Sequence, residues 1–272
     1  MNEKKVWQPG EILADRYIID HCVRQSATAC LYAAEDVNRG APQLILGAGP
    51  SVLADPRSLE WFGQYCKQAL AAPGHVNVLS ARIADHHRGV PFLVMQYATG
   101  RFWDTAIEEG RLKSLPAMLD VALQVARGVK WLHTYNQTHY NLKPANVLIA
   151  DPRLPKVWKY GQADAKSRIY ASPEQLDGSE PITPATDIWS WGLSVLHMFV
   201  GRLAWHSGRK APTVLKRYIL HGPAEEGLPA MPGELVELLR ECFQTDPKER
   251  PGDMGRIVEA MEALLKQAPF GE

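Results

Sequence analysis

The sequence of 272 residues predicts an α+β fold in which a sheet-rich amino-terminal part precedes a helix-rich carboxy-terminal part. Up to about Gly100, short apolar runs alternate with polar turns, and beyond that point apolar residues recur at helical spacing. The hydrophobic content of 46% over this length is enough to build a substantial core in one large domain or two lobes.

In the amino-terminal part, short apolar runs at 17–19, 30–34, 43–46 and 91–95 indicate strands of an antiparallel sheet. One helix interrupts these strands at 58–71, where apolar residues recur at helical intervals until a Pro-Gly pair ends the pattern. We therefore expect a sheet with a single main helix.

The carboxy-terminal part begins with a long amphipathic run at 115–133, which follows the helix-start signal Ser-Leu-Pro. The segments 187–200, 234–243 and 253–266 have the same helical spacing. The sequence contains no internal repeat and no low-complexity segment, so a mostly helical second part is expected.

Charge and cysteine spacing restrict the possible functions. Thirty basic residues offset thirty acidic ones, which removes the electrostatic argument for a general binder of nucleic acid or anionic membranes. The four cysteines lack Cys-x-x-Cys spacing, so we expect reduced core thiols and no zinc or redox site. No apolar run resembles a signal peptide or a membrane span, so we expect a soluble, cytoplasmic protein.

The segment 139–149 reads His-Tyr-Asn-Leu-Lys-Pro-Ala-Asn-Val-Leu-Ile and resembles the catalytic loop of protein kinases, usually written His-Arg-Asp-Leu-Lys-Pro-x-Asn. Further matches follow in the family's order. They are Lys-Tyr-Gly at 159–161 where the family has Asp-Phe-Gly, Ser-Pro-Glu at 172–174 for Ala-Pro-Glu, Asp-Ile-Trp-Ser-Trp-Gly at 187–192, and Asp-Pro-Lys-Glu-Arg-Pro at 246–251.

The resemblance covers about residues 12–266 and is nearest to the bacterial Ser/Thr kinases. It implies a bilobal protein kinase-like fold, with an antiparallel β small lobe that carries one main helix and a mostly helical large lobe. Met95 is implied as the gatekeeper residue before the hinge. The predicted parts are an N-terminal extension at 1–11, a small lobe at 12–97, a large lobe at 98–268 and a C-terminal tail at 269–272.

The small lobe departs from the family's phosphate-binding pattern. The three glycine positions of the phosphate-covering loop hold Arg24, Ser26 and Ala29, so the backbone cradle that glycines provide is expected to be missing. The strand at 43–47 contains no lysine, and no glutamate stands near 65–67 to pair with one. The resemblance therefore implies loss of this ion pair.

The large lobe departs from the family's pattern as well. Asn141 stands where the family has the aspartate that accepts the substrate's hydroxyl proton, and an amide has no basic site for that task. Lys159 replaces the magnesium-binding aspartate, and Tyr140 replaces an arginine that senses activation-loop phosphorylation. Lys143 and Asn146 match the family, and we interpret them as relics.

Other matched residues are implied to be structural. His139 is expected to pack and hydrogen-bond in the core, with Tyr160 beneath it. Asp187 is expected to accept hydrogen bonds from the backbone of the His139 loop. Glu174 is expected to form a partly buried ion pair with Arg250.

From these departures the sequence predicts a pseudokinase: not an enzyme, but a protein-binding, scaffolding or regulatory module in signalling, with an unidentified protein partner. No cofactor, metal, nucleic acid or membrane is expected, and neither ATP nor magnesium is expected to bind. The alternatives are a metal-independent nucleotide sensor that uses Arg24, Lys143, Asn146 and Lys159, or a weakly active Ser/Thr protein kinase. The chain is also compatible with being the kinase-like part of a longer protein. The partner's identity, the pathway and the oligomeric state stay open.

Overall fold

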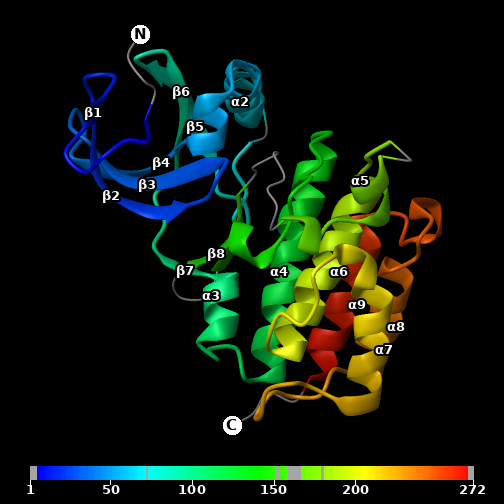
Figure 1. Ribbon diagram of the computed structural model, residues 1–272. Coiled ribbons are helices and arrows are strands. Elements are labelled where there is room, and N and C mark those ends of the chain that lie inside the picture. Colours follow the sequence, from blue (N-terminus) through cyan, green and yellow to red (C-terminus); the bar gives the residue numbers. More distant parts are fainter. Residues whose placement is uncertain (1–4, 72, 151–153, 159–166, 179–180, 269–272) are drawn as a thin grey trace. The chain divides into compact units, whose positions relative to one another are not determined.

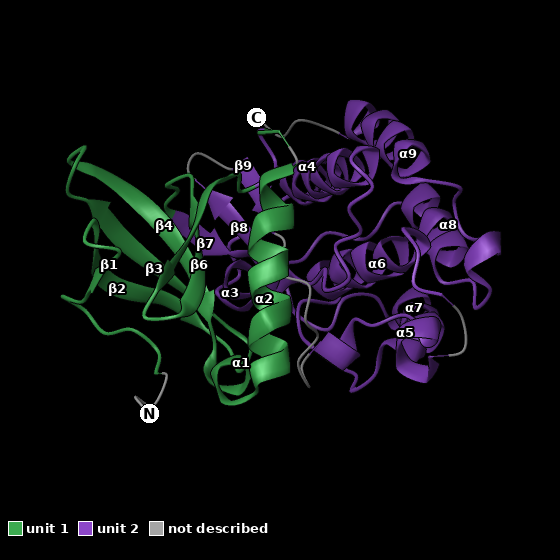
Figure 2. Cartoon of the chain, turned by 90° about the horizontal axis from the view of Figure 1, so that it is seen from above, with its two compact units in different colours: residues 1–75, 79–99 green, residues 76–78, 100–272 purple. Residues whose placement is uncertain are grey.

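The computed structural model describes residues 5–71, 73–150, 154–158, 167–178 and 181–268. The chain divides into two compact units, coloured separately in Figure 2: residues 1–75 with 79–99, and residues 76–78 with 100–272. The first unit holds most of the strands and the second most of the helices, which confirms the predicted α+β organisation. The domain ranges 12–97 and 98–268 stay a prediction.

The first unit is built on a six-stranded antiparallel sheet in the order β1-β2-β3-β4-β6-β5 (Figure 1). The strands are β1 Ile12–Leu13, β2 Tyr17–Gln25, β3 Ala29–Asp36, β4 Ala41–Ala48, β5 Ala81–His87 and β6 Val90–Met95. The four predicted strands are confirmed within β2, β3, β4 and β6. The two strands that the sequence did not predict, β1 and β5, form the edges of the sheet, where a strand needs fewer apolar residues.

Two helices accompany this sheet, α1 Pro50–Ala54 and α2 Pro56–Gln68, and α2 packs on β6. The helix predicted at 58–71 starts two residues earlier, because the Asp55 carboxylate accepts hydrogen bonds from the N–H groups of the first turn. Its last three residues form a 3-10 turn.

The core of the first unit also contains Trp7, from the predicted N-terminal extension. Its ring centroid lies 5.6 Å from that of Tyr32 and 5.8 Å from that of Phe92, and the backbone N–H of Trp7 donates to the Tyr32 hydroxyl. Gly47 on β4 makes room for the ring, because a Cβ atom there would collide with it. The segment before β1 is therefore packed into this unit.

We predict that Trp7→Ala lowers the free energy of unfolding by about 3–5 kcal/mol, because it empties a buried aromatic site. Gly47→Ala is expected to cost about 1–3 kcal/mol in the wild-type chain through overpacking against the ring, and to cost almost nothing in the Trp7→Ala background. Urea unfolding of the four proteins of this double-mutant cycle measures both effects.

Trp61→Ala is the matched control, because the Trp61 side chain is 38% exposed and its loss should cost much less. Equal losses for Trp7→Ala and Trp61→Ala, or additive effects of the changes at positions 7 and 47, would contradict the packing described above.

The second unit has a three-stranded antiparallel sheet, β7 Gly100–Phe102, β8 Val147–Ala150 and β9 Leu154–Val157. Its helices are α3 Trp103–Glu108, α4 Leu115–Thr134, α5 Pro173–Asp177, α6 Ala185–Val200, α7 Ala211–His221, α8 Gly233–Cys242 and α9 Met254–Gln267. The four predicted helices are confirmed as α4, α6, α8 and α9. The sequence did not predict α7, which buries only Ala211, Leu215 and Tyr218 and so has a narrow apolar face.

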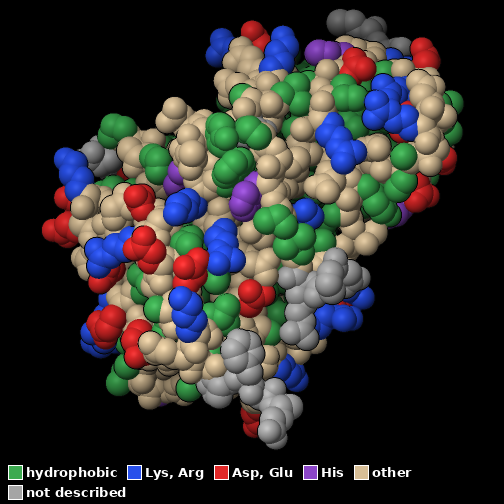
Figure 3. Space-filling view, turned by 180° about the vertical axis from the view of Figure 1, so that it is seen from behind, with side chains coloured by type: hydrophobic (Ala, Val, Ile, Leu, Met, Phe, Trp, Pro, Cys, Tyr) green, Lys and Arg blue, Asp and Glu red, His purple; other side chains and the backbone are tan. Residues whose placement is uncertain are grey.

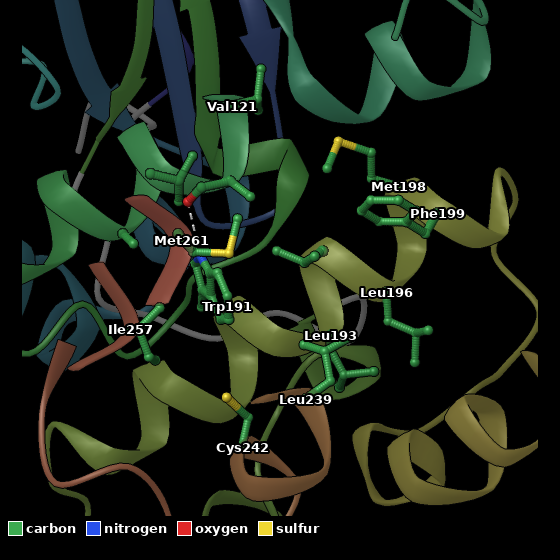
Figure 4. Packing of buried hydrophobic residues seen from close by; sticks show 14 of the residues in the cluster. Val121, Trp191, Leu193, Leu196, Met198, Phe199, Leu239, Cys242, Ile257 and Met261 are labelled. Carbon is green, nitrogen blue, oxygen red and sulfur yellow. Dashed lines mark hydrogen bonds between the residues drawn. The ribbon is translucent and has the colours of Figure 1, made fainter. Parts of the chain in front are cut away.

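The core of this unit surrounds α6, which is buried on all sides from Thr186 to Val200. Figure 4 shows residues of the cluster around it, with the Trp191 indole Nε1 donating to the Ala122 carbonyl at 3.0 Å. Trp189 is also fully buried, and Trp205 nearly so. An apolar residue on every face is what lets one helix serve as the centre of the unit.

The surface charges and the cysteine thiols can be compared with the sequence predictions. Acidic and basic side chains are interspersed on the face seen in Figure 3. Within the described residues no helix combines the length and apolarity needed to cross a membrane. Cys30, Cys66 and Cys242 are buried free thiols. Cys22, on β2 next to the edge strand β1, is exposed, so the prediction of a core thiol is wrong for this residue.

Candidate functional site

The loop that follows α4 is held in place by Asp187 of α6, whose side chain is fully buried. Its carboxylate accepts the N–H of His139 at 2.7 Å and the N–H of Tyr140 at 3.0 Å. His133 Nε2 lies 2.8 Å from the same carboxylate, and because a carboxylate only accepts, this nitrogen donates. Sequence reasoning missed His133 as a contributor, although it stands in the last turn of α4, directly before the loop.

Tyr140 occupies the left-handed region of backbone space, with φ of +63°. A bulky residue adopts this conformation only where its surroundings hold it there. Here the N–H donates to Asp187, and the carbonyl accepts from Gln175 Nε2 at 2.7 Å. The Tyr140 side chain itself is exposed.

His139 has both ring nitrogens engaged. Its Nδ1 accepts from the N–H of Asn141 at 3.3 Å, so Nε2 carries the hydrogen and donates to the Trp158 carbonyl at 2.9 Å. The ring is fully buried. These contacts make His139 a positioning residue that links the loop to the end of β9.

The polar residues of the loop make hydrogen bonds, one of which involves Ser167, a residue that the sequence did not indicate. Lys143 Nζ, on a side chain that is nearly buried, donates to the Ser167 hydroxyl at 2.9 Å. Asn146 Nδ2 donates to the Asn141 carbonyl at 2.7 Å. Asn146 is thus linked to Asn141 through its side chain and to Lys143 through its backbone N–H, which donates to the Lys143 carbonyl at 2.8 Å. Ammonium and amide groups of this kind are suited to binding phosphate oxygens.

Glu174 and Arg250 form a buried bidentate ion pair, with nitrogen–oxygen distances of 2.7 and 2.8 Å. Thr186 Oγ1 donates to the same carboxylate, and the guanidinium lies over the Trp189 ring. Burial, the largest single effect, raises the pKa of Glu174, but hydrogen bonds from Arg250, the backbone and Ser172 together with the Arg250 charge outweigh it and hold this pKa below its ordinary value. The pair joins α5 to the segment before α9.

In the first unit, Ser26 and Ala29 lie in the tight turn between β2 and β3. The Ser26 hydroxyl accepts from the N–H groups of Thr28 at 3.3 Å and of Ala29 at 3.0 Å. The Ala27 carbonyl accepts from both the N–H and the hydroxyl of Ser51. The turn therefore uses the N–H groups of Ser26, Thr28 and Ala29 internally and is tied to the start of α1.

The remaining predicted positions of this unit lie on strands. Arg24 stands in β2 beside an irregularity in the pairing with β3. Met95 ends β6, buried between Leu44 of β4 and Ala81 of β5. Leu46, in the strand that lacks a lysine, is completely buried. The functional roles assigned to these positions stay predictions.

Lys159 and Tyr160 lie outside the described residues. Within the described ranges no group of three or more histidine, cysteine, aspartate or glutamate side chains is placed to hold a metal ion. The prediction that no metal binds stays untested.

Comparison with known proteins gives consistent results. The model of the family described as "Protein kinase domain" matches residues 68–267. A protein of Clostridium acetobutylicum named as a probable serine/threonine-protein kinase is 24% identical over 270 residues, which cover 93% of this chain and 40% of that protein. Serine/threonine-protein kinase A of Synechocystis is 26% identical over 305 residues, which cover 96% of this chain and 56% of that protein. The chain thus spans about half the length of these relatives or less.

Among solved structures, the PknI kinase domain of Mycobacterium tuberculosis superimposes with a TM-score of 0.72 at 18% identity, covering 95% of this chain and 99% of that one. This similarity confirms the predicted kinase-like fold, with an antiparallel sheet in one unit and helices in the other.

The prediction that the chain is not an enzyme is wrong. The relatives are named serine/threonine-protein kinases, and the family model extends over the loop at 139–146 and both partners of the Glu174–Arg250 pair. The physical reason is that replacing a base or an acid lowers a rate by a finite factor and does not remove the site that positions the reactants.

We predict that Glu174→Gln lowers the free energy of unfolding by about 3–5 kcal/mol at neutral pH, because it leaves the Arg250 charge buried without its partner. Since the pKa of Glu174 is lower in the folded protein, this advantage of the wild type is complete above the unfolded pKa of about 4.3. It should shrink as the pH falls through that value toward the folded pKa, which urea unfolding at several pH values measures.

Glu234→Gln, in the exposed first turn of α8, is the control and should have little effect at any of these pH values. A wild-type advantage over Glu174→Gln that stays constant between neutral and acid pH would rule out the ion pair as its source.

Proposed function

The chain belongs to the protein kinase domain family, and from this premise we propose that it is a serine/threonine protein kinase domain that transfers phosphate slowly. The observation that supports this most directly is the buried contact between Lys143, two positions after Asn141 in the loop, and Ser167. It keeps a positive charge in the loop that the family uses for phosphoryl transfer.

Kinases have little covalent chemistry to perform, and most of their rate comes from positioning the reactants and neutralising charge. In the proposed reaction the substrate hydroxyl oxygen attacks the γ-phosphorus of ATP and the bond to the bridging oxygen of ADP breaks. Lys143 stabilises the charge on the transferred group. Asn146 holds the Asn141 carbonyl and so fixes the loop.

Asn141 makes the proposed reaction slow. Its amide can orient the hydroxyl but has no basic site, so the hydroxyl proton passes to an oxygen of the transferred phosphoryl group. A general base contributes on the order of a hundredfold to ten-thousandfold in rate. Slow transfer is therefore the expected behaviour of this loop.

Magnesium, which the family implies, does not fit the described residues of this loop. Asn146 uses its Nδ2 for the Asn141 carbonyl, and only its Oδ1 could ligate a cation. The described residues offer no group of three or more carboxylate, histidine or cysteine side chains to complete such a site. In the proposed reaction Lys143 neutralises the phosphate charge.

We predict that Asn141→Asp raises the rate of phosphate transfer from radiolabelled ATP to casein by about a hundredfold to ten-thousandfold, because it supplies the missing base. Lys143→Ala should abolish the transfer in both backgrounds. Initial rates over a time course, with phosphoserine and phosphothreonine identified in the product, provide the measurement.

Asn136→Asp is the matched control: it makes the same chemical change at an exposed residue five positions before Asn141 and should leave the rate unchanged. The proposal is abandoned if the wild type and Asn141→Asp are both silent while the two proteins unfold with the same midpoint.

The expectation that neither ATP nor magnesium binds can be tested separately from catalysis. We predict that ATP raises Tm equally with magnesium and with EDTA, because Lys143 rather than a metal would hold the phosphates. At ATP tenfold above Kd the stabilisation is about 1.4 kcal/mol, or about 3 °C in Tm. Lys143→Ala should remove the shift, and a shift that needs magnesium would contradict this mode of binding.

A second candidate function is regulation of a protein partner by binding. The observation that favours it is the turn at 26–29, where the N–H groups of Thr28 and Ala29 are bonded internally and thus less available to phosphates. Absence of any ATP-induced change in Tm at millimolar nucleotide would support this candidate over phosphoryl transfer.

A further inference from the structure

A cavity of about 460 Å³ in the second unit takes no part in the proposed reaction. Its walls come from α3, the α3–α4 loop, the last turn of α6 and the loop before α8. Apolar side chains make up much of the lining, namely Ile107, Leu112, Met198, Leu203 and Leu228. Its volume lies within the range of small-molecule sites.

His197 brings a polar group to this apolar lining, although its side chain is only 4% exposed. Its Nδ1 lies 2.9 Å from the Tyr170 hydroxyl. Among the described residues this is the hydroxyl's one hydrogen-bond partner, so the hydroxyl donates to Nδ1 and the hydrogen of the ring sits on Nε2. Burial lowers the pKa of His197 to about 4, so the ring is neutral near pH 7.

The Nε2 hydrogen is available to the cavity that His197 lines. Within the described part of the chain no protein atom accepts from this nitrogen, and the atom is not fully sealed from solvent. A buried donor that only a cavity can satisfy is a strong indication of a ligand, because leaving such a donor unmet costs free energy.

The charges around the rim nearly cancel. The basic side chains are Lys113 and Arg202, and the acidic ones are Glu108, Glu225 and Glu226. Arg202 Nε lies 3.9 Å from Glu225 Oε1. The interior offers no ionised group, so a charged ligand would lose its hydration without gaining a partner.

We propose that this cavity binds an uncharged small molecule with an apolar body and a single carbonyl oxygen, which accepts the hydrogen bond from His197 Nε2. The apolar lining takes the body, and the one buried donor fixes its orientation. The proposal rests on residues that the proposed reaction does not use, so either can fail without the other.

The same contacts lead from the cavity to the kinase-like loop. The Tyr170 N–H donates to the Ser167 carbonyl at 3.0 Å, and the Ser167 hydroxyl accepts from Lys143. A ligand that fixes His197 therefore also constrains the turn that carries the partner of Lys143.

The test is a titration of the full chain, labelled with ¹⁵N-histidine, with octanamide, observing the imidazole resonances. We expect a saturable shift of the His197 Nε2 signal, identified by its loss in His197→Gln. Octanoate and octylamine should bind about tenfold more weakly, which corresponds to about 1.4 kcal/mol, because neither offers a neutral carbonyl oxygen.

Leu203→Trp is expected to lose octanamide binding. Leu203 lines the cavity and is 45% exposed, so an indole at this position can fill the cavity without disturbing the core. Leu220→Trp, at a 68% exposed position of α7 outside the lining, should bind like the wild type. The proposal is overturned by an unshifted His197 signal at the solubility limit of octanamide. Equal binding of the three probes, or undiminished binding by folded Leu203→Trp, would overturn it as well.

Discussion

The second unit depends on the buried carboxylate of Asp187. A buried charge in the first turn of an apolar helix is costly unless donors surround it, and here two backbone N–H groups and His133 do so. The carboxylate therefore determines the path of the loop at 139–146. The positions of Asn141, Lys143 and Asn146 follow from that path.

Much of the fold could be predicted from the sequence because its central elements are strongly apolar. The strands β2, β3, β4 and β6 and the long helices bury one face or all faces, so their periodicity is visible without tertiary information. The edge strand β5 and the helix α7 were missed because their contacts with the core are few. Trp7 was missed for a different reason, since nothing local indicates that a residue before the first strand packs against Tyr32 and Phe92.

The candidate site was predictable to the extent that it lies within one continuous motif. Sequence order alone placed Asn141, Lys143 and Asn146 together, but Ser167 and Gln175 contribute through contacts that only the folded chain creates. The prediction that the protein is not an enzyme failed at another step. It treated substituted side chains as proof of lost activity, whereas phosphoryl transfer in this family depends largely on positioning.

The backbone of Tyr140 has a consequence for how such loops diverge. Its left-handed conformation is maintained by hydrogen bonds to its own N–H and carbonyl, made by Asp187 and Gln175, while its side chain extends into solvent. The identity of the side chain is thus uncoupled from the geometry that the main chain must keep. A loop built in this way can exchange the chemical groups it displays over evolutionary time while its architecture persists.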